Sequence, residues 1–222
     1  MIAWFSDPAH WTGTDGVFAL VIQHLIYSGV ALFFSCLIGL PIGLYVGHTG
    51  RGVVVIAGLA NALRALPSLG LIVLLVILFG PVFASDMAFI VPSIIVLVLL
   101  AVPPIMSATY AGVAAVDPAA VDAARGMGKR PLDILDVELP CALPLIFSGL
   151  RSATLQIIST ATIAAYVSLG GLGRLIIDGR AQNDYYQMAA GAVLVGALAL
   201  MVDLVIGIIS RLTVSPGLTR RA

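Results

Sequence analysis

Charge is the first thing that this sequence lacks. Of its 222 residues, only 10% are Asp, Glu, Lys or Arg, while 60% are hydrophobic, and the mean hydropathy is +1.11. A soluble domain carries roughly 25% charged residues, so this chain cannot cover a water-facing surface, and we expect it to be surrounded by lipid. The formal net charge is zero. The sequence contains no stripe of basic residues of the kind that would indicate a nucleic-acid partner.

Motifs for metal binding and catalysis are also missing. The two cysteines, Cys36 and Cys141, lie in or beside apolar runs and are interpreted as small apolar filler. His24 and His48 do not have a metal-ligand spacing, and no metal site is expected. The sequence contains neither the H-E-x-x-H pattern of membrane metalloenzymes nor the G-x-x-x-x-G-K-[ST] phosphate loop. We therefore expect a chain that is not an enzyme and that binds no cofactor of its own.

Long uncharged runs are what the sequence does contain. They cover residues 16–50, 65–85, 87–116, 152–173 and 185–202, and each approaches or exceeds the ~20 residues that cross a bilayer as a helix. Backbone groups in lipid must pair within the chain, which favours helices. The sequence predicts an all-α, polytopic membrane bundle in one domain over 1–222. We expect about five transmembrane helices, near 18–47, 54–80, 87–113, 142–166 and 186–211.

The distribution of Lys and Arg predicts the orientation. An odd number of spans places the loop 48–53, the insert 114–141 and the C-terminus on one side, and these segments hold most of the chain's Lys and Arg. Because cytoplasmic loops are enriched in Lys and Arg, we expect the N-terminus outside and the C-terminus in the cytoplasm. Only Arg174 and Arg180 run against this bias. The first Lys or Arg is Arg51, so no cleavable signal peptide is expected.

Polar residues inside the runs are candidates for function. Asp203 is an ionisable group in the last run, for which we expect an ion pair with Arg151 or Arg64. Gly39, Gly43 and Gly47 repeat every fourth residue, a spacing that favours close helix packing. Candidate residues of a translocation path come from the polar stretches around Pro67 and in the fourth run; the alternative is that their hydroxyls bond helix backbone. The path candidates are Arg64, Ser68, Ser159, Thr160, Thr162 and Tyr166.

One compact insert, residues 116–140, holds 8 of the 22 charged residues. Asp117 is a good N-cap and Pro118 suits the first helical position. The alanines that follow favour helix, and Gly128 suits a left-handed stop. The insert predicts a helix of about 10 residues and a second short helical element before Pro140. Such a helix could be a rigid handle gripped by another protein, or a solvated loop with helical content.

The insert resembles the cytoplasmic loop of binding-protein-dependent ABC importer permeases. Asp122-Ala123-Ala124 stands for the family's Glu-Ala-Ala, and Gly128 stands for its glycine. Val137, Leu139 and Pro140 correspond to the Ile-x-Leu-Pro ending, with one residue fewer between Gly128 and Pro140 than in the family. The stretches 63–71, 160–173 and 189–204 resemble the subfamily that imports glycine betaine, choline, carnitine and related osmoprotectants.

The resemblance implies that the insert is a coupling helix docked on a separate ATPase. Its core would be Asp122, Ala123, Ala124, Arg125 and Gly128. The implied partners are two cytoplasmic ABC ATPase subunits, which hold ATP and Mg, a second copy of this permease or a similar one, and an extracytoplasmic substrate-binding protein. The aromatic content is only 7%, which favours a weak, transient path over a tight cage for a quaternary amine. The alternatives are a permease for an amino acid such as methionine and a membrane scaffold that transports nothing.

Overall fold

The computed structural model describes residues 2–83 and 85–215, except for the side chains of residues 64, 131 and 132. The described part contains helices, short turns and loops, and no strand. Short 3-10 turns connect the helices at Pro8–His10, Gly80–Val82, Pro131–Ile134 and Ala165–Val167. The helices in chain order are α1 (Ile2–Ser6), α2 (Val17–Thr49), α3 (Val53–Ala65), α4 (Ser68–Phe79), α5 (Met87–Ala114), α6 (Pro118–Gly126), α7 (Leu135–Ala164), α8 (Gly173–Gln182) and α9 (Tyr185–Thr213).

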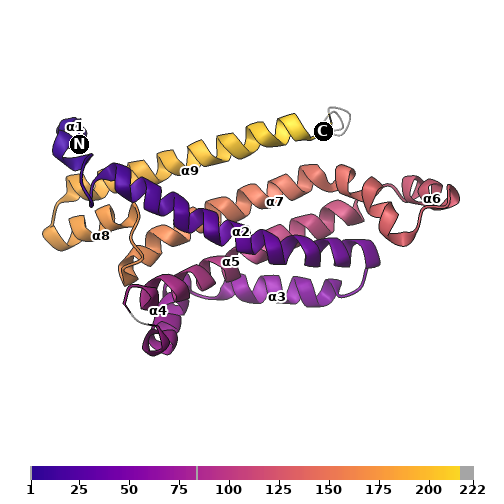
Figure 1. Cartoon of the computed structure of the whole chain (residues 1–222), viewed down its shortest axis with the longest axis horizontal. Helices are drawn as coiled ribbons and strands as arrows, with labels where there is room; N and C mark the ends of the chain where they lie inside the picture. The colour runs from indigo at the N-terminus through magenta and orange to yellow at the C-terminus, as the bar shows by residue number, and fades with distance from the viewer. Residues whose placement is uncertain (1, 84, 216–222) are drawn as a thin grey trace.

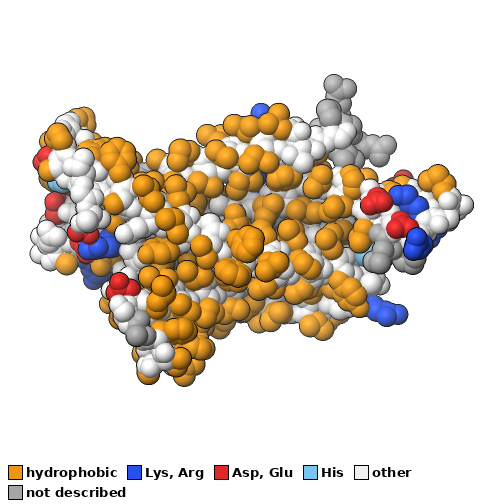
Figure 2. Space-filling model, in the orientation of Figure 1, with side chains coloured by type: hydrophobic (Ala, Val, Ile, Leu, Met, Phe, Trp, Pro, Cys, Tyr) orange, Lys and Arg blue, Asp and Glu red, His pale blue; other side chains and the backbone are white. Residues whose placement is uncertain are grey.

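The long helices run along one axis with α3 beside them, while α1 and α8 lie at one end and α6 at the other (Figure 1). The α6 end also carries the α2–α3 turn and the last turn of α9. The α8 end carries α1 and the start of α5. Figure 2 shows that charged side chains collect at these two ends, while hydrophobic side chains cover most of the surface between them. This is the surface expected of a bundle whose midsection lies in lipid.

Among the described residues, four helices are long and apolar enough to span a membrane alone, namely α2, α5, α7 (with the turn that follows it) and α9. A fifth span is formed only if α3 and α4 are taken together, because they meet at an angle of 89°. The expected span at 54–80 is therefore broken. Leu66 has an extended backbone at the break, which is the conformation that a following proline imposes.

The buried axis of the bundle is α5, which packs between α2 and α7. Its residues Val96, Leu97, Ala101 and Ile105 are fully buried. Between helices in lipid, association depends on close packing rather than on the exclusion of water. Glycines of α2 and α7 allow this close packing against α5. A Cβ on Gly43 of α2 would lie 2.6 Å from Cβ of Thr109, and the equivalent glycine contacts of α2 with α5 are made by Gly39 and Gly47.

Three segments differ from the sequence-based expectations. Helix α7 begins at Leu135, well before the expected residue 142, so the second element of the insert is a 3-10 turn that leads directly into the span. The connection after the fourth span contains a full helix, α8. Residues 2–15, where the sequence predicted no helix, contain α1 and a 3-10 turn, and Trp4 stacks on His10 with ring centroids 4.3 Å apart.

Candidate functional site

Helix α6 forms because its start and its end are both capped. At the start, Oδ1 of Asp117 accepts a hydrogen bond from the backbone N–H of Ala119 at 2.9 Å, and Pro118 occupies the first helical position. These are the caps that the sequence predicts. Along the helix, Arg125 donates to Asp122 at 3.2 Å, three residues earlier. Both side chains are exposed, so this pair adds little stability.

Gly128 ends α6 with a left-handed residue at φ +83. The N–H of Lys129 donates to the carbonyl of Ala124 at 3.2 Å, and the N–H of Gly128 donates to that of Arg125 at 2.9 Å. These two bonds are the Schellman pattern, which satisfies helix-end carbonyls and favours glycine at this position. A Cβ there would meet nothing within 4 Å. The glycine is therefore required by the backbone turn and not by crowding within the chain.

The candidate coupling residues lie on α6 and in the turn that ends it, and most of them are exposed. Asp122, Ala123, Arg125 and Gly128 face away from the chain, whereas Ala124 is 1% exposed. Helix α6 packs on the Pro131–Ile134 turn and on the start of α7. The result is a short, stiff helix with small and oppositely charged side chains, held at one end of the bundle between its spans α5 and α7.

A partly buried side-chain hydrogen bond lies close to this segment. Nδ1 of His48, at the end of α2, is 2.7 Å from Oε2 of Glu138 in the first turn of α7, and Glu138 is only 6% exposed. This contact joins the end of α2 to the first turn of α7, the helix that follows α6.

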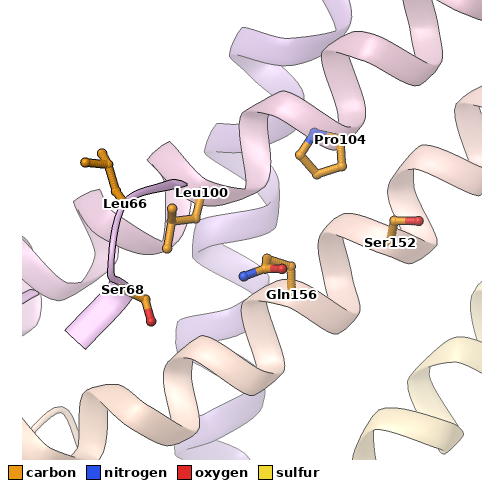
Figure 3. Close-up of a pocket in the computed structure, with 6 residues that line it drawn as sticks. All are labelled: Leu66, Ser68, Leu100, Pro104, Ser152 and Gln156. Carbon is orange, nitrogen blue, oxygen red and sulfur yellow. The ribbon is translucent and has the colours of Figure 1, made fainter. Parts of the chain in front are cut away.

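A cavity of about 480 Å³ opens near the middle of the bundle, between the α3–α4 break, α5 and α7. We call it the central cavity. Figure 3 shows its lining residues, and the Gln156 side chain extends from α7 into the space between the helices. The lining is polar but uncharged at Ser68, Ser152 and Gln156. The remaining lining residues are Leu66, Leu100 and Pro104.

Two backbone irregularities border the central cavity. The chain is not helical at Leu66 and Pro67. Pro104 has no N–H, so it cannot pair with the carbonyl of Leu100 as a regular helix would. Irregular backbone at membrane depth is tolerated where it is covered by protein or lines a water-filled cavity. The cavity therefore has the properties of a hydrated space within the membrane.

The structure separates the path candidates that the sequence grouped. Ser68 lines the central cavity. Tyr166 lines a different cavity at the α8 end. The three hydroxyls between them bond within α7: Thr162 donates to the carbonyl of Ile158 at 2.9 Å, Ser159 to that of Gln156 at 3.0 Å, and Thr160 accepts from the Gln156 amide at 3.3 Å. Arg64 is in α3 next to the break, but its side chain lies outside the described part.

Sequence reasoning missed Ser152 and Gln156, the two polar residues that α7 contributes to the central cavity. A signal for them existed. Ser148, Ser152 and Gln156 recur every fourth residue and are all exposed, so they form a polar stripe on one face of an apolar helix. A stripe of this kind on a membrane helix indicates contact with another protein chain or with water.

Asp203 of α9 pairs with Arg151 of α7, one of the two partners expected from the sequence. The contact is bidentate, with Nε–Oδ1 2.6 Å and Nη2–Oδ2 2.5 Å. Arg151 lies in the middle of α7. Two opposite charges held in this fork geometry compensate each other. Within the described residues, no three metal-ligating side chains come together.

The chain is similar to a known family over most of its length. The family described as "Binding-protein-dependent transport system inner membrane component" matches residues 39–219. Among solved structures, two inward-facing forms of the MetNI methionine ABC transporter are similar in fold, with TM-scores of 0.75 and 0.78 at 24% and 23% identity. Both matches cover 95% of this chain and all of the matched chain.

Curated relatives cover nearly the whole chain. The choline transport system permease protein OpuBB of Bacillus subtilis is 31% identical over 199 residues, 89% of this chain and 88% of that protein. The glycine betaine/carnitine/choline permease OpuCB of the same species is 30% identical, covering 88% of each chain. The carnitine permease OpuCD of Listeria monocytogenes is 28% identical, over 90% of this chain and 86% of that protein. With its bundle of apolar spans and its capped, exposed α6, the chain belongs to the family of binding-protein-dependent transport system inner membrane components.

Proposed function

We propose that this chain is the transmembrane permease subunit of an ABC importer for small quaternary amines of the glycine betaine, choline and carnitine type. The observation that carries the transport role is α6. It is a capped helix with exposed Asp122, Ala123 and Arg125, inserted between two spans. The substrate class is supported by the relatives named above, which are permeases for choline, carnitine and glycine betaine.

The orientation follows from the α6 end. This end holds Arg51, Arg125, Lys129, Arg130 and Arg211, whereas Arg174 and Arg180 lie in α8 at the other end. Since cytoplasmic segments are enriched in Lys and Arg, the α6 end faces the cytoplasm and the N-terminus lies outside. This orientation places α6 where a cytoplasmic ATPase can reach it.

Energy for transport comes from a separate ATPase, because this chain has no phosphate-binding loop of its own. Two ATPase subunits grip two such helices, one from each of two paired permeases. When the ATPases close on ATP, each α6 moves with its ATPase. The displacement reaches α7 through the short Pro131–Ile134 turn and reaches α2 through the His48–Glu138 contact.

The central cavity is the transport path in this scheme. Its hydroxyl and amide groups can solvate a small polar solute, but they include no charge that would hold it tightly. Selection then falls to an extracytoplasmic binding protein, which delivers the solute at the α8 end. Uncharged polar contacts suit a passage from which the solute must also leave.

The test uses the chain co-expressed with its ATPase and binding protein and reconstituted in liposomes. ATP hydrolysis is measured with choline, glycine betaine, carnitine and methionine. We expect stimulation by quaternary amines. Stimulation by methionine alone would overturn the substrate class and favour an amino-acid permease.

The coupling role is tested with Gly128→Trp, which places a bulky side chain on the docking surface and strains the left-handed turn. The matched control is Gly50→Trp. Gly50 is also left-handed, at φ +67, has open space around its Cβ position, and lies at the same end outside α6. We expect Gly128→Trp to abolish uptake while membrane insertion persists, and the control to retain uptake. Retained uptake in Gly128→Trp would contradict the coupling role and favour a scaffold.

A further inference from the structure

A second cavity, of about 510 Å³, lies at the α8 end, opposite α6. We call it the α8-end cavity. Four separate parts of the chain line it: α2, the start of α5, the connection after α7, and α8 itself. The chemically distinctive lining residues are Tyr27, Asp86, Tyr166, Arg174 and Asp178. This size is ordinary for a small-molecule site.

The charges of the α8-end cavity leave an excess of negative charge. Arg174 is its one cationic lining residue, and Nη1 of this arginine lies 2.9 Å from Oδ1 of Asp15. Nε of the same arginine lies 3.4 Å from Oδ2 of Asp178. Among the described residues Asp86 has no ion-pair partner, although it lines the same cavity. A cation entering the cavity would therefore find a carboxylate that is not already engaged.

The two tyrosines add the second element of cation recognition. Tyr27 comes from α2 and Tyr166 from the 3-10 turn after α7, so only the fold brings them to one cavity. A quaternary ammonium has no N–H to donate, and proteins hold it against aromatic faces and near carboxylates. No local sequence pattern indicates such an arrangement, because the two tyrosines are 139 residues apart in the chain.

One wall of the cavity is fixed in place by the chain's own backbone. Ser168, Gly170 and Gly171 have left-handed φ values of +68, +89 and +73. The N–H of Gly171 donates to Oε1 of Gln23 in α2 at 3.2 Å. A Cβ on Gly170 would lie 2.9 Å from the same oxygen. The connection therefore lies directly against α2, and this wall of the cavity is held by contacts within the chain.

We propose that the α8-end cavity is a receiving site for the trimethylammonium group of the substrate, held by Tyr27, Tyr166 and the carboxylate of Asp86. This assignment rests on the proposed function for its substrate class and its orientation. The cation would dock here when the binding protein releases it. Tyr166 directly follows α7, whose residue Gln156 lines the central cavity, so α7 connects the two sites.

The experiment measures binding to the permease–ATPase complex in nanodiscs without the binding protein. The probes are choline and 3,3-dimethylbutanol, a neutral compound of the same shape with carbon in place of nitrogen. Saturation transfer from protein to the methyl protons of each probe is followed by NMR. We expect transfer to choline to exceed transfer to the neutral probe by about fivefold, which is the order of one cation–π contact.

The variants are Tyr166→Leu, Asp86→Asn and Tyr166→Phe, with Tyr185→Leu as the matched control. Tyr166 is 60% exposed, so substitution there does not disturb the core, and Tyr185 is an exposed tyrosine at the start of α9 that does not line the cavity. We expect the first two variants to lower choline transfer several-fold, and Tyr166→Phe and the control to keep it. Equal transfer to the two probes in the unmodified protein, or unchanged choline transfer in Tyr166→Leu, overturns the proposal.

Failure of this inference is distinguishable from failure of the proposed function. If choline with the binding protein stimulates ATP hydrolysis while the NMR experiment shows no charge preference, the importer function is supported and the receiving site is rejected. If no quaternary amine stimulates ATP hydrolysis in the complete system, the substrate class itself is wrong. The site is then rejected with it unless choline transfer still depends on Tyr166 and Asp86.

Discussion

Helices α5 and α9 are nearly equal in length and hydropathy but differ in how deeply they are buried within the chain. They have 28 and 29 residues, and the mean hydropathy of their most apolar stretch is 2.6 and 2.7. Yet 61% of that stretch is buried within the chain in α5 and only 6% in α9. Hydropathy therefore predicts that a helix spans the membrane, but not whether it faces protein or lipid.

Small residues on the neighbouring helices explain the difference. Gly43 of α2 and Gly149 of α7 both bring a backbone against α5, and a Cβ on Gly149 would lie 2.5 Å from that of Ala108. Helix α9 has close glycine contacts only near its start, where Gly191 packs on Leu175 and Ile176 of α8. Gly196 and Gly207 further along α9 meet nothing within 4 Å. Lipid chains are as apolar as leucine, so packing geometry decides which helix becomes the axis.

The largest effect is expected where this packing is broken. Gly43→Leu places a side chain where the carbonyl of Met106 lies 2.7 Å from the Cβ position. Because the backbone must then move, we expect the free energy of unfolding to fall by about 3 kcal/mol or more, which is the upper range for overpacking. Gly196→Leu is the matched control in α9 and should leave stability unchanged or slightly improved, since leucine favours helix.

Apparent melting temperatures of the two variants in detergent measure this contrast. A large fall for Gly43→Leu alone supports the division between axis and periphery. An equal fall in melting temperature for Gly196→Leu would show that another chain covers α9 in the assembled protein. The contrast between α5 and α9 would then hold only for the single chain.

A smaller effect is expected at the ion pair that holds α9 to the bundle. Asp203→Leu leaves the guanidinium of Arg151 without its bidentate carboxylate between two membrane helices, and an uncompensated charge there is unfavourable. We expect the melting temperature to fall in Asp203→Leu and to recover in the double variant Arg151→Leu/Asp203→Leu, because removing both charges removes the imbalance. A double variant no more stable than the single one would show that the pair contributes attraction of its own.

The sequence predicted the spans well for a simple physical reason. Helices α2, α5 and α9 begin and end within a few residues of the expected limits, because each is an apolar run bounded by polar or glycine-rich turns. The beginning of α7 was missed because Asp136, Glu138 and Pro140 resemble a loop. Glu138 is accommodated in that helix by a partner 90 residues away, His48, and no local pattern reveals such a contact.

The candidate site also has parts that local sequence patterns predict and parts that depend on contacts between distant segments. Helix α6 was predictable because its caps, Asp117 and Gly128, are local signals within 12 residues of each other. The central cavity was only partly predictable. Pro67 marked the break and Ser68 was identified, but Ser152 and Gln156 face the cavity only after α7 folds back beside α4. The α8-end cavity joins residues 27 and 166, and its two tyrosines had no local relation to detect.

The smallest effect is expected when one threonine in each of the two helices is replaced by alanine. Thr109 of α5 and Thr213 of α9 both donate their hydroxyl to the carbonyl four residues earlier at 2.8 Å. Thr109 is fully buried against Gly43, while Thr213 is exposed. Substitution by Ala removes the same hydrogen bond from each helix, so the difference between the variants isolates the packing of the Thr109 side chain.

We expect Thr109→Ala to cost about 1 kcal/mol, as for loss of one buried methyl group, and Thr213→Ala to stay within about 0.5 kcal/mol, as for an exposed site. Chemical or thermal unfolding in detergent measures both. Equal costs would mean that the hydrogen bond from the threonine hydroxyl to the carbonyl, and not the contact with Gly43, accounts for the contribution of Thr109 to stability. In that case the glycine spacing would permit the approach of α2 without contributing attraction, and burial of α5 would have to come from its contacts with α7.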